Sequence, residues 1–325
     1  MPSNIAIIRA VINGDAHYLW GQADKLQDET PLSPLSPTLS FSSKKFRDFF
    51  SHAITKPISF LGNLREEQAI LNPIPHPGKT ICAALNYPSH VHELGQSLPK
   101  TPTFFSKYPG ALTNPYSSLL LPTNNMLLDN EVELGVIVGS HLPWRSDPTP
   151  EKVEESIFGY VLVNDVTSRR LLIVDEGKLW RSKNLPQSTP VGPWIIPTNT
   201  MKNLTGFIEP GTPTLHLTST ISRRGVTQSG STNEMLFSVA EIFNKILEAT
   251  SLDPGDLIFT GTPGGTGLRI SKIERIVAGL TNYRLKNNFL RNQARSLRYL
   301  QHKDVVTIEG EWLGIQRCHI EEGIP

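Results

Sequence analysis

Acidic side chains lie within and directly after segments whose apolar patterns are typical of buried strands. Glu131 and Glu133 belong to the largely apolar segment Glu131–Val138, and Asp165 closely follows the apolar segment Gly159–Val163. An ionised carboxylate is costly to bury unless a positive charge compensates it, so the fold has to place a cation beside these groups. Oxygen ligands without His or Cys suit a hard divalent ion, which means Mg²⁺, Mn²⁺ or Ca²⁺. We therefore interpret the chain as a metal-dependent enzyme that acts on an oxygen-rich small molecule.

The spacing of these carboxylates is compatible with a shared site. Glu131 and Glu133 are two residues apart, so on a strand both project from one face, while Val132 and Leu134 pack on the other. Two like charges on one face repel each other, and a divalent cation relieves the repulsion. Asp165 is expected at the end of its own strand, where a third ligand can converge. A pair of solvent-facing glutamates on an edge strand is the alternative, and it is the commoner origin of Glu-x-Glu taken alone.

The composition is that of a globular protein. The 325 residues are 38% apolar and 19% charged, which excludes a disordered chain and suggests one large domain with a smaller attachment. Lys and Arg number 31 against 30 Asp and Glu, and this net charge of +1 gives no argument for nucleic acid or an anionic membrane as a partner. Cys82 and Cys318 are too few for a disulfide framework or a cysteine-based metal site, and ordinary buried residues are the favoured interpretation.

The sequence shows no signal for a membrane. No apolar run reaches the roughly 18 residues that are needed to span a bilayer. The apolar region of a signal peptide is also missing, because polar residues interrupt the N-terminal segment at Asn4, Arg9, Asp15 and His17. We therefore expect a cytoplasmic protein with neither a membrane nor a nucleic acid as partner.

Proline-rich segments divide the chain unevenly. Ile5–Trp20 is predicted to form two short strands around an Asn-Gly-Asp turn, and Phe46–Ile54 a short helix. Between them, Pro31–Ser43 is rich in Pro and Ser, which predicts a surface loop. A second Pro-rich segment, Asn72–Gly78, then separates this piece from the remainder. We expect a small N-terminal domain at residues 1–78 and a larger domain at 79–325 that carries the candidate site.

The larger domain is dominated by strand signals and has few helices. Thr149-Pro150 gives one helix an N-cap followed by proline, and Ser238 with Glu241 gives another a capping box. The second helix is predicted to bury Ile242, Phe243, Ile246 and Leu247. Apolar or alternating segments predict strands at Ile81–Leu85, Glu131–Val138, Gly159–Val163, Leu215–Ser222 and Leu257–Thr260. Too few strands alternate with helices for a doubly wound sheet, so we predict a β-rich α+β fold.

A second group of polar residues lies upstream, in the segment Asn86–Leu94. His90 and Glu93 are three residues apart, so one helical turn places them on a shared face. A carboxylate beside an imidazole orients the ring and favours its protonated form, which is how a general base is usually built. A surface ion pair is the commoner origin of a His-x-x-Glu pair on its own. His92 lies between the two and is expected to point elsewhere.

Taken together, the motifs between Thr80 and Gly267 resemble those of the fumarylacetoacetate hydrolase family. They follow one another in the family's order: Asn-Tyr-x-x-His-x-x-Glu (Asn86–Glu93), Phe-x-Lys (Phe105–Lys107), Asp-x-Glu-x-Glu-Leu (Asp129–Leu134), Gly-Tyr-x-x-x-Asn-Asp-x-x-x-Arg (Gly159–Arg169), Lys183, Gly-Pro-Trp (Gly192–Trp194) and Pro-Gly-Asp-x-Ile-x-Thr-Gly-Thr-Pro (Pro254–Pro263). So many elements in one order make coincidence implausible. The resemblance implies a mixed β-sandwich roll that assembles as a homodimer.

The resemblance also implies roles for individual residues. The positions that match the family's Mg²⁺ or Mn²⁺ ligands are Glu131, Glu133 and Asp165. On a lid that closes over the substrate, His90 matches the base that activates water and Glu93 matches its orienting partner. Lys183 matches the lysine that binds substrate oxygens and stabilises developing negative charge. The remaining matches near the substrate are Thr262 of the Gly-Thr-Pro turn and the basic residues Lys107 and Arg169.

Such a site suits the hydrolytic cleavage of a C–C bond in a 1,3-dicarbonyl or an acylpyruvate-like 2-oxo acid. A divalent cation acts on a substrate carbonyl as a Lewis acid. Water activated by His90 can attack that carbonyl, and Lys183 can stabilise the enolate that leaves. The same electron sink supports decarboxylation of a β-keto or 2-oxo acid, which is the alternative. A catalytically weak member that acts as a binding protein is the alternative of another class, and the intact set of ligands, base and lysine favours the enzyme.

Two departures from the family pattern concern the substrate. The family commonly continues Asn-Asp-x-x-x-Arg-Asp-x-Gln, whereas this chain has Arg170 in place of the acid and Leu172 in place of the glutamine. Loss of that amide removes a polar contact worth roughly 1 kcal/mol or more if it is buried. We therefore expect a bulkier, more apolar substrate than acylpyruvate or oxaloacetate.

A basic insertion at residues 268–302 separates the Gly-Thr-Pro turn from the closing strand at Lys303–Ile308. It contains eight Lys or Arg residues and one Glu. The favoured interpretation is a helical excursion with a solvated face. The alternatives are that the insertion covers the active site or a dimer contact and binds an anionic substrate group, or that its interleaved aromatic residues mark a nucleic-acid surface.

Overall fold

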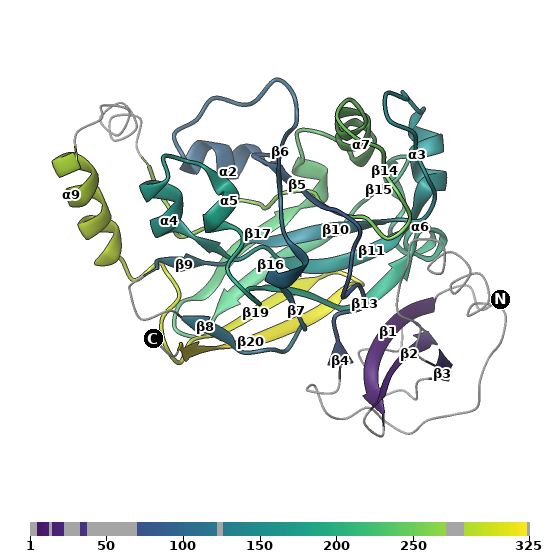
Figure 1. The fold of residues 1–325 in the computed structure, drawn as a ribbon, viewed down its shortest axis with the longest axis horizontal. Helices are drawn as coiled ribbons and strands as arrows, with labels where there is room; N and C mark the ends of the chain where they lie inside the picture. Colours follow the sequence, from purple (N-terminus) through teal and green to yellow (C-terminus); the bar gives the residue numbers. More distant parts are fainter. Residues whose placement is uncertain are drawn as a thin grey trace.

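The computed structural model describes residues 5–12, 15–22, 33–37, 70–121, 126–270 and 283–323. Within them, the larger of two main β-sheets has 11 strands (Figure 1). Its hydrogen-bonded order is β3 (Ser33–Pro37), β2 (Asp15–Gln22), β1 (Ile5–Ile12), β13 (Thr189–Pro197), β11 (Ile157–Asn164), β10 (Val132–Val138), β18 (Leu257–Phe259), β5 (Thr80–Ala84) and β6 (Thr103–Ser106). Two short strands pair at its side, β4 (Ile70–Leu71) with β1 and β7 (Leu112–Thr113) with β13.

The second sheet has five strands and faces the first. Its order is β17 (Gly225–Ser231), β16 (His216–Ile221), β19 (Val305–Gly310), β20 (Gly314–Glu322) and β8 (Leu119–Leu121). Two further pairs are small, β9 (Leu128–Asp129) with β12 (Thr167–Ser168) and β14 (Phe207–Glu209) with β15 (Thr212–Pro213). The described helices are α2 (Pro88–Glu93), α3 (Pro150–Ser156), α4 (Arg169–Val174), α5 (Leu179–Ser182), α6 (Thr198–Thr205), α7 (Val239–Leu247) and α9 (Tyr283–Ala294). The β-rich α+β prediction is confirmed.

Alternation along β10 separates the main core from the face that carries the candidate site. Val132 and Leu134 belong to the large apolar cluster that also includes Leu217 of β16 and Val306 of β19, so this face packs on the second sheet. Glu133 therefore projects from the opposite face. In Figure 1, helices α2, α4 and α5 lie together over one end of the larger sheet. The expected division of β10 into an apolar face and an acidic face is confirmed.

The N-terminal strands continue the larger sheet. β1 and β2 form the predicted antiparallel hairpin, but Asp15, expected in the turn, begins β2 and pairs with Ile12. β1 also pairs with β13 at Ile7 and Ile195. The loop expected over Pro31–Ser43 is wrong for residues 33–37, which form β3. Among the described strands, β3 is the last in the sheet's order, and an edge strand tolerates proline because one of its sides needs no N–H donors for the sheet. The helix expected at Phe46–Ile54 lies outside the described residues, and the boundary at 1–78 and 79–325 stays a prediction.

The helix start signals are confirmed by the structure. Thr149 caps α3, with its side chain accepting a hydrogen bond from the N–H of Lys152. Ser238 and Glu241 form the predicted capping box of α7, and the four predicted apolar residues of that helix are buried. Both cysteines are buried and unpaired.

Candidate active site

The pairing of β10 with β11 brings the three predicted metal ligands together. Asn164, the last residue of β11, pairs with Val132, the first residue of β10. Asp165 follows directly, and its N–H donates to the carbonyl oxygen of Glu131 across 2.8 Å. The carboxylates of Glu131, Glu133 and Asp165 each offer an oxygen atom, and these atoms all lie within 4.8 Å of one another. All three side chains are buried. A set of carboxylate oxygens alone fits Mg²⁺, Mn²⁺ or Ca²⁺.

Cationic side chains reach the same carboxylates. Lys183 Nζ contacts Glu131 Oε2 and lies 2.6 Å from Asp165 Oδ2. Lys107 Nζ lies 2.5 Å from the other carboxylate oxygen of Asp165, Oδ1. Arg169 Nη2 lies 2.5 Å from Glu131 Oε1. The predicted substrate-binding residues Lys107 and Arg169 therefore contact the candidate ligands directly in this structure, and their contact with substrate stays a prediction.

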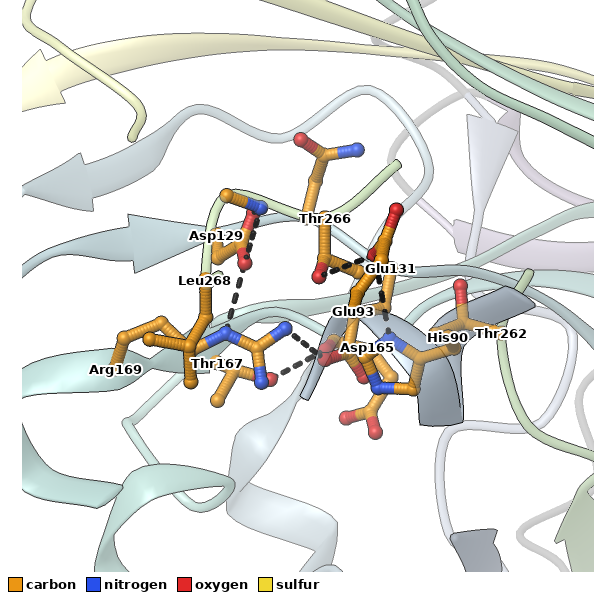
Figure 2. A network of polar contacts seen from close by, with 12 residues as sticks. His90, Glu93, Asp129, Glu131, Asp165, Thr167, Arg169, Thr262, Thr266 and Leu268 are labelled. Atoms are coloured by element: carbon orange, nitrogen blue, oxygen red, sulfur yellow. Dashed lines mark hydrogen bonds and ion pairs between the residues drawn. The ribbon is translucent and has the colours of Figure 1, made fainter. Parts of the chain in front are cut away.

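Arg169 also connects the site to Asp129, for which the sequence analysis predicted no role. Arg169 Nε lies 2.8 Å from Asp129 Oδ2, and both oxygens of Asp129 lie 2.8 Å from the N–H nitrogen of Gly267. The pairing of β9 with β12 places these groups side by side, because Thr167 lies opposite Asp129. Figure 2 shows the network running from Arg169 and Asp129 at one end to His90 at the other. The sequence signal that could have indicated this role is the motif Asp-x-Glu-x-Glu, because Asp129 is its first acid.

The charges of this cluster do not balance. Its carboxylates are the three candidate ligands and Asp129, and its cations are Lys107, Lys183 and Arg169, which leaves one negative charge in excess when all are ionised. Glu133 forms no ion pair with any described residue. Burial raises the pKa of its carboxyl well above the ordinary value, and the two neighbouring carboxylates raise it further. A divalent cation would remove this repulsion, so the residues present fit a metal ion.

Lys183 keeps its charge although it is buried. Burial alone disfavours the ammonium form, but the carboxylates of Asp165 and Glu131 outweigh it and raise the pKa of Lys183. Burial likewise opposes ionisation of Glu131, yet Lys183 and Arg169 hold the pKa of that carboxyl below its ordinary value. Lys183 Nζ also lies 5.2 Å from the centroid of the Phe105 ring, within the range of a cation–π contact. A fixed cation is therefore available beside the candidate ligands.

Helix α2 places His90 and Glu93 close together, as predicted, but no hydrogen bond joins them. His90 Nδ1 lies 3.8 Å from Glu93 Oε2. That nitrogen is buried and has no hydrogen-bond partner among the described residues. Glu93 Oε1 instead accepts the N–H of Gly265 across 2.7 Å, and Oε2 lies 2.7 Å from Arg269 Nη1. Glu93 is thus held by the glycine-rich turn and the insertion, and its role as partner of His90 stays a prediction.

The Gly-Thr-Pro turn after β18 closes another side of the site. The N–H of Gly261 donates to Glu133 Oε2 across 2.8 Å. Gly261 has a φ of 94°, and a Cβ there would lie 2.9 Å from Asn86 Cβ, so this close approach favours glycine. Thr262 Oγ1 donates to a backbone carbonyl of β10 across 2.9 Å and accepts from Gln228 Nε2 at 2.8 Å. The Thr262 hydroxyl keeps one lone pair for the predicted substrate contact, and Gln228 is a supporting residue that the sequence did not indicate.

The residues that depart from the family pattern lie on α4, the helix that begins with Arg169. Arg170 and Leu172 are half-buried on α4. The basic insertion forms helix α9, which confirms the helical excursion in part, and residues 271–282 lie outside the described chain. Leu290 of α9 packs with Leu127 and Tyr299 in a buried apolar cluster that also contacts α4. The insertion therefore lies beside the candidate site.

The comparison with known proteins agrees with this geometry. Residues 79–321 match the family model of the fumarylacetoacetate (FAA) hydrolase C-terminal region. A fumarylacetoacetate hydrolase domain-containing protein 2 homolog from Dictyostelium discoideum is 31% identical over 234 residues, covering 70% of this chain and 74% of that protein. The mitochondrial oxaloacetate tautomerase FAHD2A of Bos taurus is 29% identical over 205 residues, covering 63% of this chain and 62% of that protein.

Solved structures share the fold. The fumarylacetoacetate hydrolase of psychrophilic Exiguobacterium antarcticum superposes with a TM-score of 0.70 at 23% identity, covering 98% of this chain and 100% of that chain. A 2-hydroxyhepta-2,4-diene-1,7-dioate isomerase from Mycobacterium marinum gives 0.66 at 21% identity, covering 99% and 100%. None of the described helices is both long and apolar enough to cross a membrane. Its sequence relatives include proteins named hydrolase and tautomerase, and the family model covers most of the chain. The chain therefore belongs to the fumarylacetoacetate hydrolase family.

Proposed function

We propose that the protein is a divalent-metal-dependent hydrolase that cleaves a C–C bond in a 1,3-dicarbonyl or an acylpyruvate-like 2-oxo acid. The observation that carries this proposal is the buried group of three carboxylates with the ammonium of Lys183 beside it. Glu131, Glu133 and Asp165 would hold Mg²⁺ or Mn²⁺, which supplies Lewis-acid polarisation of a substrate carbonyl when bound. The family resemblance supports a homodimer, and we include this assembly in the proposal.

The remaining steps belong to side chains of this chain. His90 takes a proton from the water that attacks the substrate carbonyl, and the C–C bond breaks with its electron pair passing to an enolate. Lys183 stabilises the negative charge of that enolate, because its ammonium is already fixed and buried. The protonated His90 then returns the proton to the enolate carbon. The products are a carboxylic acid and a ketone or 2-oxo acid.

Tautomerisation or isomerisation of a 2-oxo acid is a second candidate. Relatives are named oxaloacetate tautomerase and 2-hydroxyhepta-2,4-diene-1,7-dioate isomerase. Such a reaction needs an enolate-stabilising cation and a proton-transfer group but no attacking water, and Lys183 and His90 meet that requirement. Decarboxylation of a β-keto or 2-oxo acid uses the same groups and stays the alternative that the sequence raised.

One screen separates these reactions. The screen supplies the enzyme with Mg²⁺ or Mn²⁺ and one of three substrate classes: acylpyruvates of short and long acyl chain, other 1,3-dicarbonyls, or β-keto acids. New carboxylate, CO₂ and enol absorbance are measured separately. We expect one new carboxylate per substrate without CO₂, and a higher kcat/KM for the longer, more apolar chain because of Leu172. Release of CO₂ would favour decarboxylation, and a change in enol absorbance alone would favour tautomerisation. Turnover of none of these substrates would contradict the enzymatic proposal and favour a binding protein.

A further inference from the structure

The carboxylate of Glu93 is held on several sides by the segment that leads into the insertion. Gly265 donates its N–H to Oε1 across 2.7 Å. Arg269 Nη1 lies 2.7 Å from Oε2, and Thr266 Oγ1 donates to the same oxygen at 3.4 Å. The backbone of Glu93 is engaged as well, because its carbonyl accepts the N–H of Ile270 across 3.0 Å. Figure 2 shows Glu93 with Thr266 and His90 close by. The end of α2 is therefore fastened to residues 265–270.

Arg269 is itself fixed by backbone contacts. Its Nη1 donates to the carbonyl oxygens of Thr266 at 2.5 Å and Leu268 at 3.2 Å. Its own carbonyl accepts from Gln293 Nε2 of α9 at 3.4 Å, and Gln293 Oε1 in turn accepts from the hydroxyl of Tyr299 across 2.5 Å. The ring of Tyr299 packs against Gly267, where a Cβ would lie 3.0 Å from ring carbon Cδ1. The helix of the insertion thus supports the position of Arg269.

The same oxygen of Glu93 faces both Arg269 and His90. Among the described residues, Arg269 is the only Lys or Arg that forms an ion pair with Glu93. The Glu93 side chain is only 18% exposed, so its ion pair with Arg269 is largely shielded from water and helps to hold the carboxylate in place. His90 Nδ1 is buried, has no hydrogen-bond partner in the described part of the chain, and lies 3.8 Å from Oε2. A small movement of the imidazole would bring the two within hydrogen-bond distance.

We propose that Arg269 is a positioning residue for the His90–Glu93 pair. Arg269 holds Oε2 of Glu93 at the place where it can accept the Nδ1–H of His90 once substrate is bound. Through Arg269, the insertion at residues 268–302 helps to position the proposed base, His90. This role goes beyond that of a solvent-exposed helix. The inference rests on the proposed function, in which His90 transfers the proton.

The test compares Arg269→Ala and Arg269→Lys with Arg295→Ala, which removes an exposed arginine of the same insertion. Arg269→Ala should lower kcat by about 10-fold to 100-fold, as the loss of a supporting partner commonly does. KM and the Kd for Mn²⁺ should stay within about twofold, because Arg269 contacts no candidate metal ligand. Arg269→Lys should restore part of kcat, and Arg295→Ala should leave all three quantities unchanged.

A double-mutant cycle shows whether Arg269 acts through Glu93. In a Glu93→Gln background, Arg269→Ala should cause no further loss of kcat. Hydrogen exchange of the α2 backbone amides gives a readout without catalysis, and Arg269→Ala should accelerate it while Arg295→Ala should not. Wild-type kcat in Arg269→Ala, additive losses in the cycle, or a parallel loss of Mn²⁺ binding would overturn the proposal. If the wild type turns over no substrate, the proposed function fails, and unchanged α2 exchange in Arg269→Ala would separately refute the positioning role.

Discussion

The guanidinium group of Arg169 donates from Nη2 to Oε1 of Glu131 across 2.5 Å, and both side chains are buried. Lys183 contacts the other oxygen, Oε2, so protein cations engage both oxygens of one candidate metal ligand. Each carboxylate oxygen has a second lone pair that can coordinate a metal ion. The orientation of Glu131 is therefore set by the protein before any ion binds, which is a form of preorganisation.

Replacement of Arg169 by Met should destabilise the protein strongly. It leaves Asp129 buried without its cation and Glu131 with Lys183 alone, and breaking a buried pair in this way costs about 3–5 kcal/mol of the free energy of unfolding. Arg169→Lys keeps a charge but cannot bridge the two carboxylates with a fork of N–H donors, so its loss should be smaller. Urea unfolding measures both, with the exposed Arg295→Met as the control that should change by less than about 0.5 kcal/mol. A loss below about 1 kcal/mol for Arg169→Met would contradict the role of the buried pair.

Replacement of Lys183 by Met should separate catalysis from metal binding. The variant loses the cation beside the developing enolate, so kcat should fall roughly 10²-fold to 10³-fold. The affinity for Mn²⁺ should not fall, because every ligand oxygen remains and the carboxylates lose a competing cation. Steady-state kinetics and calorimetric titration measure the two effects. The exposed Lys178→Met serves as a control that should match the wild type. If Mn²⁺ binding disappears together with kcat, Lys183 holds the ligands in place and the assigned role is wrong.

Asp253, which lies shortly before β18, gives a prediction on stability in acid through its ion pair with Lys79, the residue before β5. Its Oδ2 lies 2.9 Å from Lys79 Nζ and its Oδ1 lies 2.7 Å from His141 Nδ1. The hydrogen bond from Lys79 contributes most to lowering the pKa of Asp253 from 3.8 to about 2. At a pH above the ordinary pKa of 3.8, the lowered pKa of Asp253 stabilises the folded state. This contribution is lost as the pH falls toward about 2. Because the side chain is 38% exposed, screening limits the contribution to about 1 kcal/mol.

The measurement is the difference in free energy of unfolding between the wild type and Asp253→Asn, followed from pH 5 downward. The difference should be constant above the ordinary pKa of 3.8 and should shrink below it. A difference that stays constant or grows on acidification would show that the ion pair does not stabilise the folded state.

Sequence patterns predicted the features that local rules govern. The capping box at Ser238 determines where α7 begins, and alternation of polarity identifies β16 as a half-exposed strand, because these signals lie within a few residues. The meeting of Glu133 with Asp165 was also expected, since strands that are close in sequence often pair and both acids lie at strand ends.

Other parts of the site depend on contacts between distant segments. Arg169 and Asp129 are 40 residues apart, and Gln228 and Thr262 are 34 apart, so no periodicity within either segment indicates these pairs. The contact between Glu93 and Arg269 likewise requires knowing that the glycine-rich turn packs on α2. Such pairs follow from the packing of the sheets and turns, and only the structure shows them.

Glu133 offers the most direct test of the metal site, because it forms no ion pair with a described residue and its replacement by Gln removes one charge at nearly constant volume. The side-chain oxygen of Gln can still accept the N–H of Gly261, which now donates to Oε2 across 2.8 Å. Calorimetric titration with Mn²⁺ should show one ion bound per wild-type chain and an affinity at least about tenfold weaker in Glu133→Gln. Glu309→Gln, which changes an exposed strand glutamate, should bind as the wild type does. Equal Mn²⁺ affinity in Glu133→Gln and the wild type, or no binding by the wild type, would contradict the metal site.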